Sequence, residues 1–225
     1  MLIDVSSLST FPSVDFYFLR HGKSEGNRQG LVQGQLNYPI SEEGREQAKT
    51  TGKWFLGKRI VKVFTTPLDR GKETARIVSE VASLPDPEEL PALMELDTGL
   101  FTGITLEEAK ARYPEVYRQF LRESWEGVEG AEKILKLKER AILAWNTLIT
   151  AAKEAASIRP NERIGVLAVS HAGFLQWIVK VTLGSSSWFP LLPMGDCGIY
   201  QLSVQGTVSR WVLLNFQAPG VTGHR

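Results

Sequence analysis

Two kinds of hydrophobic pattern alternate along this chain. Continuous apolar runs, such as residues 16–19 and 164–169, end at polar residues, as strands buried on both faces do. Between them, apolar side chains recur every three or four residues, which is the spacing of an amphipathic helix. Strands are predicted at 16–19, 60–65, 164–169, 198–204 and 208–214, and a further short strand at 91–95.

Residues that cap helices mark where the helical segments begin. Ser41 precedes two glutamates, and Thr105 opens a Thr-x-x-Glu capping box. Thr66 is expected to cap another helix, with Pro67 at its first helical position. Helices are predicted at 41–55, 66–82, from 105 onward, 131–156 and 172–183.

The alternation of strands and helices, followed by a hairpin over 198–214, indicates the architecture. It predicts an α/β fold, a three-layer α/β/α sandwich around a mixed, mostly parallel sheet. A chain of 225 residues fits one such domain, and no internal repeat or linker divides it. We interpret residues 1–14, which show little periodicity, as an N-terminal extension.

Composition narrows the range of partners. A formal net charge of +1 argues against a nucleic-acid surface or a polybasic membrane face, and no apolar run approaches the length of a membrane span. The single cysteine, Cys197, is interpreted as a free buried thiol, which fits a reducing, cytoplasmic compartment. No cluster of cysteine, histidine and aspartate suggests a metal site, so neither a metal nor a cofactor is expected.

Polar residues gather directly after the predicted strands. Ligands of α/β sheets bind beyond the carboxyl ends of the strands, so we expect these residues to meet at one rim of the sheet. An arginine beside a histidine at a glycine turn is well suited to a phosphate. The clusters expected at this rim are Arg20-His21, Thr65-Thr66, Glu95 and His171.

Each of these residues also has a structural interpretation. A lone histidine after a strand is more often structural than catalytic. Arg70 is compatible with a surface cation, although it lies in the first turn of a predicted helix, where free N–H groups attract anions. Glu95 is compatible with a solvated carboxylate, although its apolar neighbours predict partial burial and a raised pKa.

Five motifs, taken together and in order, resemble those of the histidine phosphatase superfamily, also called the phosphoglycerate mutase-like family. The resemblance extends from about residue 16 to residue 214. Its most specific part is Arg20-His21-Gly22 followed by Ser24 and Asn27. The other matching segments are 37–48, 65–75, 93–103 and 169–173.

This resemblance implies a role for each matching residue. His21 would be the nucleophile that becomes phosphorylated, and Glu95 would protonate the leaving group. The two arginines and the second histidine would hold the phosphoryl oxygens, and an asparagine and a backbone N–H group would complete the pocket. The residues implied for this phosphate pocket are Arg20, Asn27, Arg70, His171 and Ala172.

Elementary physical chemistry favours the same roles. Nearby cations disfavour a positive charge on His21, which keeps its ring neutral before the substrate binds. A backbone carbonyl is expected to hold the tautomer through the other ring nitrogen. A carboxyl group with a raised pKa at Glu95 supplies the proton that the leaving alkoxide needs. Positioned cations stabilise the charge that spreads over the oxygens during phosphoryl transfer, so no metal is required.

Three residues depart from the family's usual pattern or match it loosely. Lys23 stands where glutamate or glutamine is usual, and two interpretations stay open: a cation that favours an acidic substrate, or a solvated side chain. Gly26 stands where a large aromatic residue is frequent, so substrate contacts there are expected to differ. Glu132 is interpreted as a solvated acid at the start of a helix.

The reaction expected from these residues is hydrolysis of a small phosphomonoester through a phosphohistidine on His21. A phosphoglycerate mutase that depends on 2,3-bisphosphoglycerate is the alternative, although residues 97–103 resemble the phosphatase form of the acid loop. A second alternative is a phosphate-binding module without turnover. Residues from about 100 to 130 are interpreted as a cap that sets substrate specificity. The physiological substrate and the oligomeric state have no signature in the sequence.

Overall fold

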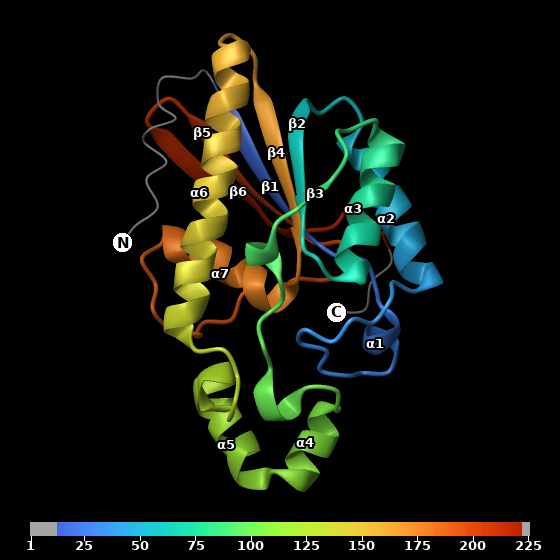
Figure 1. Cartoon of the computed structure of the whole chain (residues 1–225), viewed down its shortest axis with the longest axis vertical. Helices are drawn as coiled ribbons and strands as arrows, with labels where there is room; N and C mark the ends of the chain where they lie inside the picture. The colour runs from blue at the N-terminus through green and yellow to red at the C-terminus, as the bar shows by residue number, and fades with distance from the viewer. Residues whose placement is uncertain (1–12, 222–225) are drawn as a thin grey trace.

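A six-stranded sheet in the order β3-β2-β4-β1-β5-β6 organises the chain (Figure 1). The structure, a computed structural model, describes residues 13–221. The first four strands in this order run parallel to their neighbours, whereas β5 is antiparallel to β1 and β6 is antiparallel to β5. The strands are β1 (Val14–Arg20), β2 (Ile60–Thr65), β3 (Glu88–Glu89), β4 (Ile164–Ser170), β5 (Ile199–Gln205) and β6 (Val208–Phe216).

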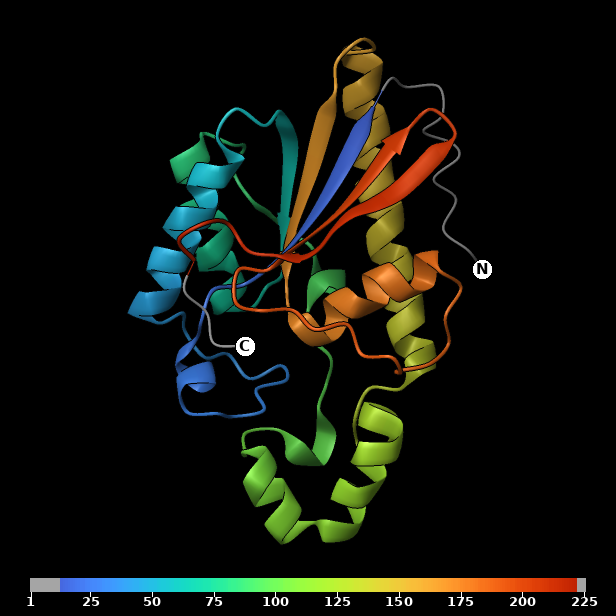
Figure 2. The same cartoon turned by 180° about the vertical axis from the view of Figure 1, so that it is seen from behind.

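Helices cover both faces of this sheet, and alternate residues of β1 show how. Phe16 and Phe18 pack into the core that α6 (Ile134–Ile158) and α7 (Ala172–Thr182) contribute to. The residues between and after them, Tyr17 and Leu19, face the opposite core, which α2 (Glu42–Phe55) and α3 (Asp69–Ala82) complete. Figure 2 shows the two helical layers from behind. The predicted three-layer α/β/α sandwich with a mixed, mostly parallel sheet is confirmed.

The N-terminal side of the sheet differs slightly from the sequence prediction. Of the predicted extension 1–14, residues 1–12 lie outside the described residues. Val14, by contrast, is a buried residue of β1 and pairs with Ile164 of β4. The strand therefore begins two residues before the predicted run at 16–19.

The predicted cap of α3 was wrong. The helix begins at Asp69, with Leu68 as its N-cap, so Pro67 is not its first helical residue. The hydroxyl of Thr66 lies 3.0 Å from Nε2 of His171, whereas its distance to the backbone nitrogen of Leu68 is longer, at 3.4 Å. The side chain that the local pattern predicted as a helix cap instead makes its shorter contact with His171, a residue far along the chain.

The predicted strand at 91–95 was also wrong. Pairing with β2 ends at β3, and Leu90 donates the last backbone hydrogen bond, to Thr65. Pro91 has no N–H group with which to continue a ladder, and the chain turns into the short 3₁₀ helix η2 (Pro91–Leu93). Its N-terminal proline is therefore what separates this segment from the sheet.

A group of short helices projects from the sheet between η2 and α6 (Figure 1). Thr105 caps the first α-helix of this group with the predicted capping box. The group has its own small core around Phe101 and Val128. We call residues 99–130 the helical cap; its elements are η3 (Gly99–Phe101), α4 (Leu106–Arg112), α5 (Pro114–Glu123) and η4 (Ser124–Gly127).

No helix within residues 13–221 is long and apolar enough to cross a lipid bilayer. The single cysteine, Cys197, is fully buried, as predicted. Burial raises the pKa of its thiol to about 12. The cytoplasmic location stays a prediction.

Candidate active site

Two buried histidines lie next to each other at the carboxyl ends of the central strands. His21 directly follows β1, and His171 directly follows β4, which pairs with β1 along its whole length. Their ring centroids are 5.0 Å apart. The structure thus brings together two residues that are 150 positions apart in the sequence, at the rim that the strand pattern predicts.

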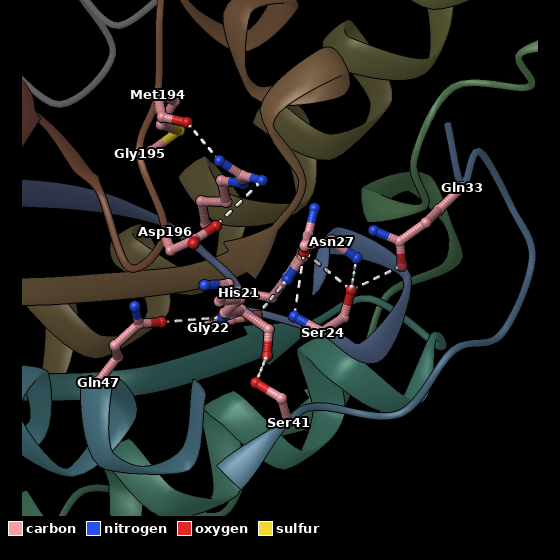
Figure 3. A network of polar contacts seen from close by, with 12 residues as sticks. His21, Gly22, Ser24, Asn27, Gln33, Ser41, Gln47, Met194, Gly195 and Asp196 are labelled. Carbon is pink, nitrogen blue, oxygen red and sulfur yellow. Dashed lines mark hydrogen bonds and ion pairs between the residues drawn. The ribbon is translucent and has the colours of Figure 1, made fainter. Parts of the chain in front are cut away.

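The ring of His21 is fixed in one orientation. Its Nδ1 lies 2.7 Å from the carbonyl oxygen of Gly22 (Figure 3). The N–H group of Gly22 in turn donates to the hydroxyl of Thr74. A carbonyl can only accept, so the proton sits on Nδ1 and the lone pair on Nε2. Burial, and then the charges of Arg70 and Arg20, hold the pKa of His21 well below 6.5. The side chain is therefore a neutral base with Nε2 as its free nitrogen.

Arg20 and Arg70 are held by groups at the ends of their guanidinium forks. Arg20 donates to the carbonyl oxygen of Met194 at 2.7 Å and pairs with Asp196 at 3.2 Å (Figure 3). Arg70 donates to the carbonyl oxygens of Gly34 and Leu36 at 2.8 and 2.7 Å. Burial lowers the pKa of Arg70 to about 10, which leaves its guanidinium charged at neutral pH.

Three buried nitrogens at this rim have no hydrogen-bond partner among the described residues. They are Nε of Arg20, Nε of Arg70 and Nδ1 of His171. An unpaired buried polar group costs about 1–3 kcal/mol, and the two arginine Nε atoms are N–H donors, so the site is prepared for a ligand that accepts hydrogen bonds. An anion with several oxygen atoms meets that requirement.

The carboxyl group of Glu95 lies between the loop after η2 and the start of α7. Its two oxygens accept from the backbone N–H groups of Leu96, at 2.8 Å, and Gly173, at 3.1 Å. Burial raises its pKa above the ordinary value of 4.5. A Cβ at Gly173 would lie 2.7 Å from Oε1 of Glu95, so only glycine lets the carboxyl group approach the helix.

Arg140 of α6 holds the main chain that carries Glu95. Its guanidinium donates to the carbonyl oxygens of Ala92 and Met94 at 3.0 and 2.5 Å. The same group pairs with Glu132 at 2.7 Å, and the Glu132 side chain is only 4% exposed. The prediction that Glu132 is a solvated acid was therefore wrong: it is the buried counter-ion of the arginine that anchors this loop.

Side chains at this rim surround a cavity of about 220 Å³. Of the predicted site residues, Arg20, His21, Asn27, Arg70, Glu95 and Ala172 line it, whereas His171 is buried behind the lining. Ala172 is the first residue of α7, where backbone N–H groups have no acceptor within the helix. The remaining lining residues are Leu31, Val32, Gln33, Gly34, Leu96, Thr98, Trp125 and Gly173.

A comparison with protein families shows which family the chain belongs to. The model of the histidine phosphatase superfamily (branch 1) matches residues 16–217, which is most of the chain. The chain belongs to the histidine phosphatase superfamily. The sequence resemblance that rested on five motifs is thereby confirmed.

Named relatives within the histidine phosphatase superfamily include phosphatases and mutases. A metal-independent phosphoserine phosphatase from Arabidopsis thaliana is 30% identical over 178 residues, covering 77% of this chain and 71% of that protein. A 2-carboxy-D-arabinitol-1-phosphatase from Triticum aestivum is 27% identical over 186 residues, which are 80% of this chain but only 35% of the wheat protein. A probable phosphoglycerate mutase from Salmonella choleraesuis is 26% identical over 202 residues, covering 88% and 89% of the two chains.

Solved structures share the fold of this superfamily member. A structure titled mycobacterial hydrolase 2 superposes with a TM-score of 0.80 and 23% identity, covering 92% of each chain. At that level of identity the match supports the fold alone.

Several residues that shape the site in this histidine phosphatase superfamily member have no local signature in the sequence. Asp196 pairs with Arg20 across 176 positions of chain, Thr74 receives the N–H group of Gly22, and Arg140 anchors the loop of Glu95. All three act through contacts between distant segments. The sequence separation of such a pair follows no fixed pattern, so it cannot be predicted from the sequence. Only the fold brings them to the rim.

The structure shows how the side chain of Lys23 is held. Its Nζ binds a carboxyl oxygen of Glu43 at 2.8 Å, and its side chain is only 17% exposed. It is not among the lining residues of the cavity, and the interpretation that it favours an acidic substrate stays a prediction. The alternative of a solvated side chain was wrong, because the lysine is paired and mostly covered.

Metal ligands do not cluster in the part of the chain that the structure describes. Within residues 13–221, no group of three or more histidine, cysteine, aspartate and glutamate side chains is arranged to hold a metal ion. The expectation that the chemistry needs no metal stays a prediction.

Proposed function

We propose that this protein is a phosphatase that hydrolyses a small phosphomonoester through a phosphohistidine on His21. One observation carries the proposal: a neutral, buried histidine whose Nδ1 is fixed on a backbone carbonyl lies beside three buried nitrogens that have no hydrogen-bond partner within residues 13–221. Fixing Nδ1 directs the lone pair of Nε2, and the unpaired Nε–H groups of Arg20 and Arg70 match the oxygens of a phosphoryl group.

In the first step, Nε2 of His21 attacks phosphorus and the bond to the leaving oxygen breaks. Arg20 and Arg70 bind the non-bridging oxygens, over which the negative charge spreads in the transition state. Asn27, His171 and the backbone N–H group of Ala172 complete this phosphate pocket. Glu95, whose raised pKa favours the protonated form, gives its proton to the leaving alkoxide.

In the second step, Glu95 is a carboxylate and takes a proton from a water molecule. That water attacks phosphorus, the bond between nitrogen and phosphorus breaks, and the electron pair returns to Nε2 of His21. Inorganic phosphate leaves, and Glu95 is again protonated. Two displacements with positioned groups replace one difficult attack of water on the ester.

The whole chain would form a single domain. Within it, the helical cap would determine which esters enter the site. Trp125 of η4 lines the cavity and packs on Phe120 of α5, with ring centroids 4.9 Å apart. Phe101 of η3 contacts the same two rings. A small aromatic cluster thus connects the lining of the cavity with the outer helices of the helical cap, and changes in those helices would reach the substrate through Trp125.

A panel of phosphomonoesters with a free-phosphate readout, run with and without 2,3-bisphosphoglycerate, tests this proposal. A phosphatase releases phosphate from the panel without priming, and the His21→Ala variant does not. Phosphoryl transfer that needs priming and releases little phosphate would favour a phosphoglycerate mutase instead, as the name of the Salmonella relative suggests. Binding of phosphoesters with no release from any of them would indicate a phosphate-binding module.

A further inference from the structure

The cavity of the proposed phosphatase contains few charges beyond those that the phosphoryl group needs. Among the described residues that line it, Arg20 and Arg70 are the cations, and no lysine belongs to the lining. Both arginines also lie next to His21, since their charges are the ones that lower its pKa. Neither is left over to pair with a second anionic group on the substrate.

Nearby basic residues are committed elsewhere. Lys23 is paired with Glu43, and Arg140 is paired with Glu132. Lys133, at the entry to α6, donates to the carbonyl oxygens of Glu126 and Val128 at 2.7 and 3.2 Å. Recruiting any of them to a bound carboxylate would break an existing contact.

The wall away from the phosphate pocket is apolar or neutral. Leu31, Val32 and Leu96 contribute aliphatic surface, and Trp125 contributes an aromatic ring. The polar groups on this wall are neutral as well, because side-chain amides and hydroxyls carry no net charge. An acidic substituent that entered this part of the cavity would lose water without gaining a counter-ion, which is costly.

A compact polar network fixes the amides of this wall. The hydroxyl oxygen of Ser24 lies 2.8 Å from both Oδ1 of Asn27 and Oε1 of Gln33 (Figure 3). Gln33 lies over Gly26, where an added Cβ would come within 2.6 Å of the Gln33 side chain. The glycine that departs from the family's frequent aromatic residue therefore makes room for a neutral amide, which can form a hydrogen bond with a hydroxyl group.

We propose that the alcohol released by this phosphatase is small and uncharged, so that monoesters of polyols or phenols are preferred over esters that carry a carboxylate. The inference rests on the proposed function and adds to it the substrate class. A cavity of about 220 Å³ is below the usual range for drug-sized ligands, which favours an alcohol of a few carbon atoms or one ring.

Two matched substrate pairs test this inference. Glycerol 3-phosphate is compared with 3-phosphoglycerate, and phenyl phosphate with para-carboxyphenyl phosphate, each pair differing by a carboxylate. We expect kcat/KM, measured by release of free phosphate, to be about tenfold or more higher for the neutral member of each pair. Equal values, or a preference for the carboxylates, would overturn the inference and leave the proposed phosphatase intact. Release from neither member of either pair would overturn the proposed function itself.

A charge added to the wall separates recognition from intrinsic reactivity. Leu31→Lys places a cation on the lining, and we expect it to raise kcat/KM for 3-phosphoglycerate relative to glycerol 3-phosphate by about tenfold. Leu121→Lys is the control, since Leu121 lies on α5, is 60% exposed and does not line the cavity. A ratio that stays constant in Leu31→Lys, or that changes equally in both variants, would show that missing positive charge does not cause the preference.

Discussion

The rim that carries the two histidines and the helical cap that projects below it are stabilised in different ways. At the rim, the charged groups of Arg70 and Arg140 are tied to backbone carbonyls from distant segments. In the helical cap, α5 has no fully buried residue, and the pairs of Arg118 and Arg112 are with glutamates on their own helices.

This difference separates two tasks. Contacts between distant segments fix the reacting groups of the rim, so a change in any one of them disturbs several others. The ion pairs of Arg112 and Arg118 in the helical cap lie within single helices, so changes there are expected to disturb His21 and Glu95 less. We infer that the rim determines the reaction and the helical cap adjusts its substrate. Substitutions in the two regions should therefore differ greatly in effect.

The largest effect is expected at the nucleophile. His21→Ala removes the group that accepts the phosphoryl group, and we expect kcat for phosphate release to fall by about 10⁴-fold or more. Circular dichroism of the variant checks that the fold is retained. Substantial activity in a folded His21→Ala variant would show that another group, or water itself, attacks the ester.

A smaller loss is expected at the general acid, and it should depend on the leaving group. Glu95→Gln keeps the size of the side chain but gives it no proton to donate. We expect kcat/KM for glycerol 3-phosphate to fall by about 10²–10⁴-fold, because an alkoxide needs that proton. Para-nitrophenyl phosphate, whose phenolate leaves unaided, should lose much less in the first step. Equal losses for both substrates would contradict the role of Glu95 as an acid.

Much of the rim could be predicted because its reacting residues follow strands. A short apolar run ending at Arg20-His21, and another ending before His171, are local signals, and parallel strands bring their carboxyl ends to one edge. The rest depended on pairs that no local pattern shows. Glu132 looked like a solvated helix-start acid until the fold placed it against Arg140. Thr66 looked like a cap until it proved to contact His171.

The pH dependence of activity should reflect the lowered pKa of His21 and the raised pKa of Glu95. His21 must be neutral, and its pKa lies well below 6.5, so we expect activity to fall on the acid side only well below that pH. Glu95 must be protonated in the first step, and its pKa lies above 4.5. When that step limits the rate, kcat/KM should fall about tenfold per pH unit above the pKa of Glu95. The alkaline fall should disappear in Glu95→Gln; its persistence would assign it to another group.

The smallest effect is expected in the helical cap. Trp125→Ala removes an aromatic surface from the cavity without touching the phosphate pocket. We expect kcat/KM for phenyl phosphate to fall by about three- to tenfold, with a smaller change for glycerol 3-phosphate, because the lost contact is an aromatic one. A loss as large as that in Glu95→Gln would mean that the helical cap also orients the reacting groups, and the division between the two regions would fail.

The stereochemical course at phosphorus tests the central claim most directly. A phosphorothioate ester made chiral at phosphorus with two oxygen isotopes is hydrolysed in water that carries the third isotope, and the configuration of the released thiophosphate is determined. Each in-line displacement inverts the configuration, so a phosphohistidine on His21 followed by a second attack predicts overall retention. Overall inversion would mean a single attack of water on the ester and would contradict the account.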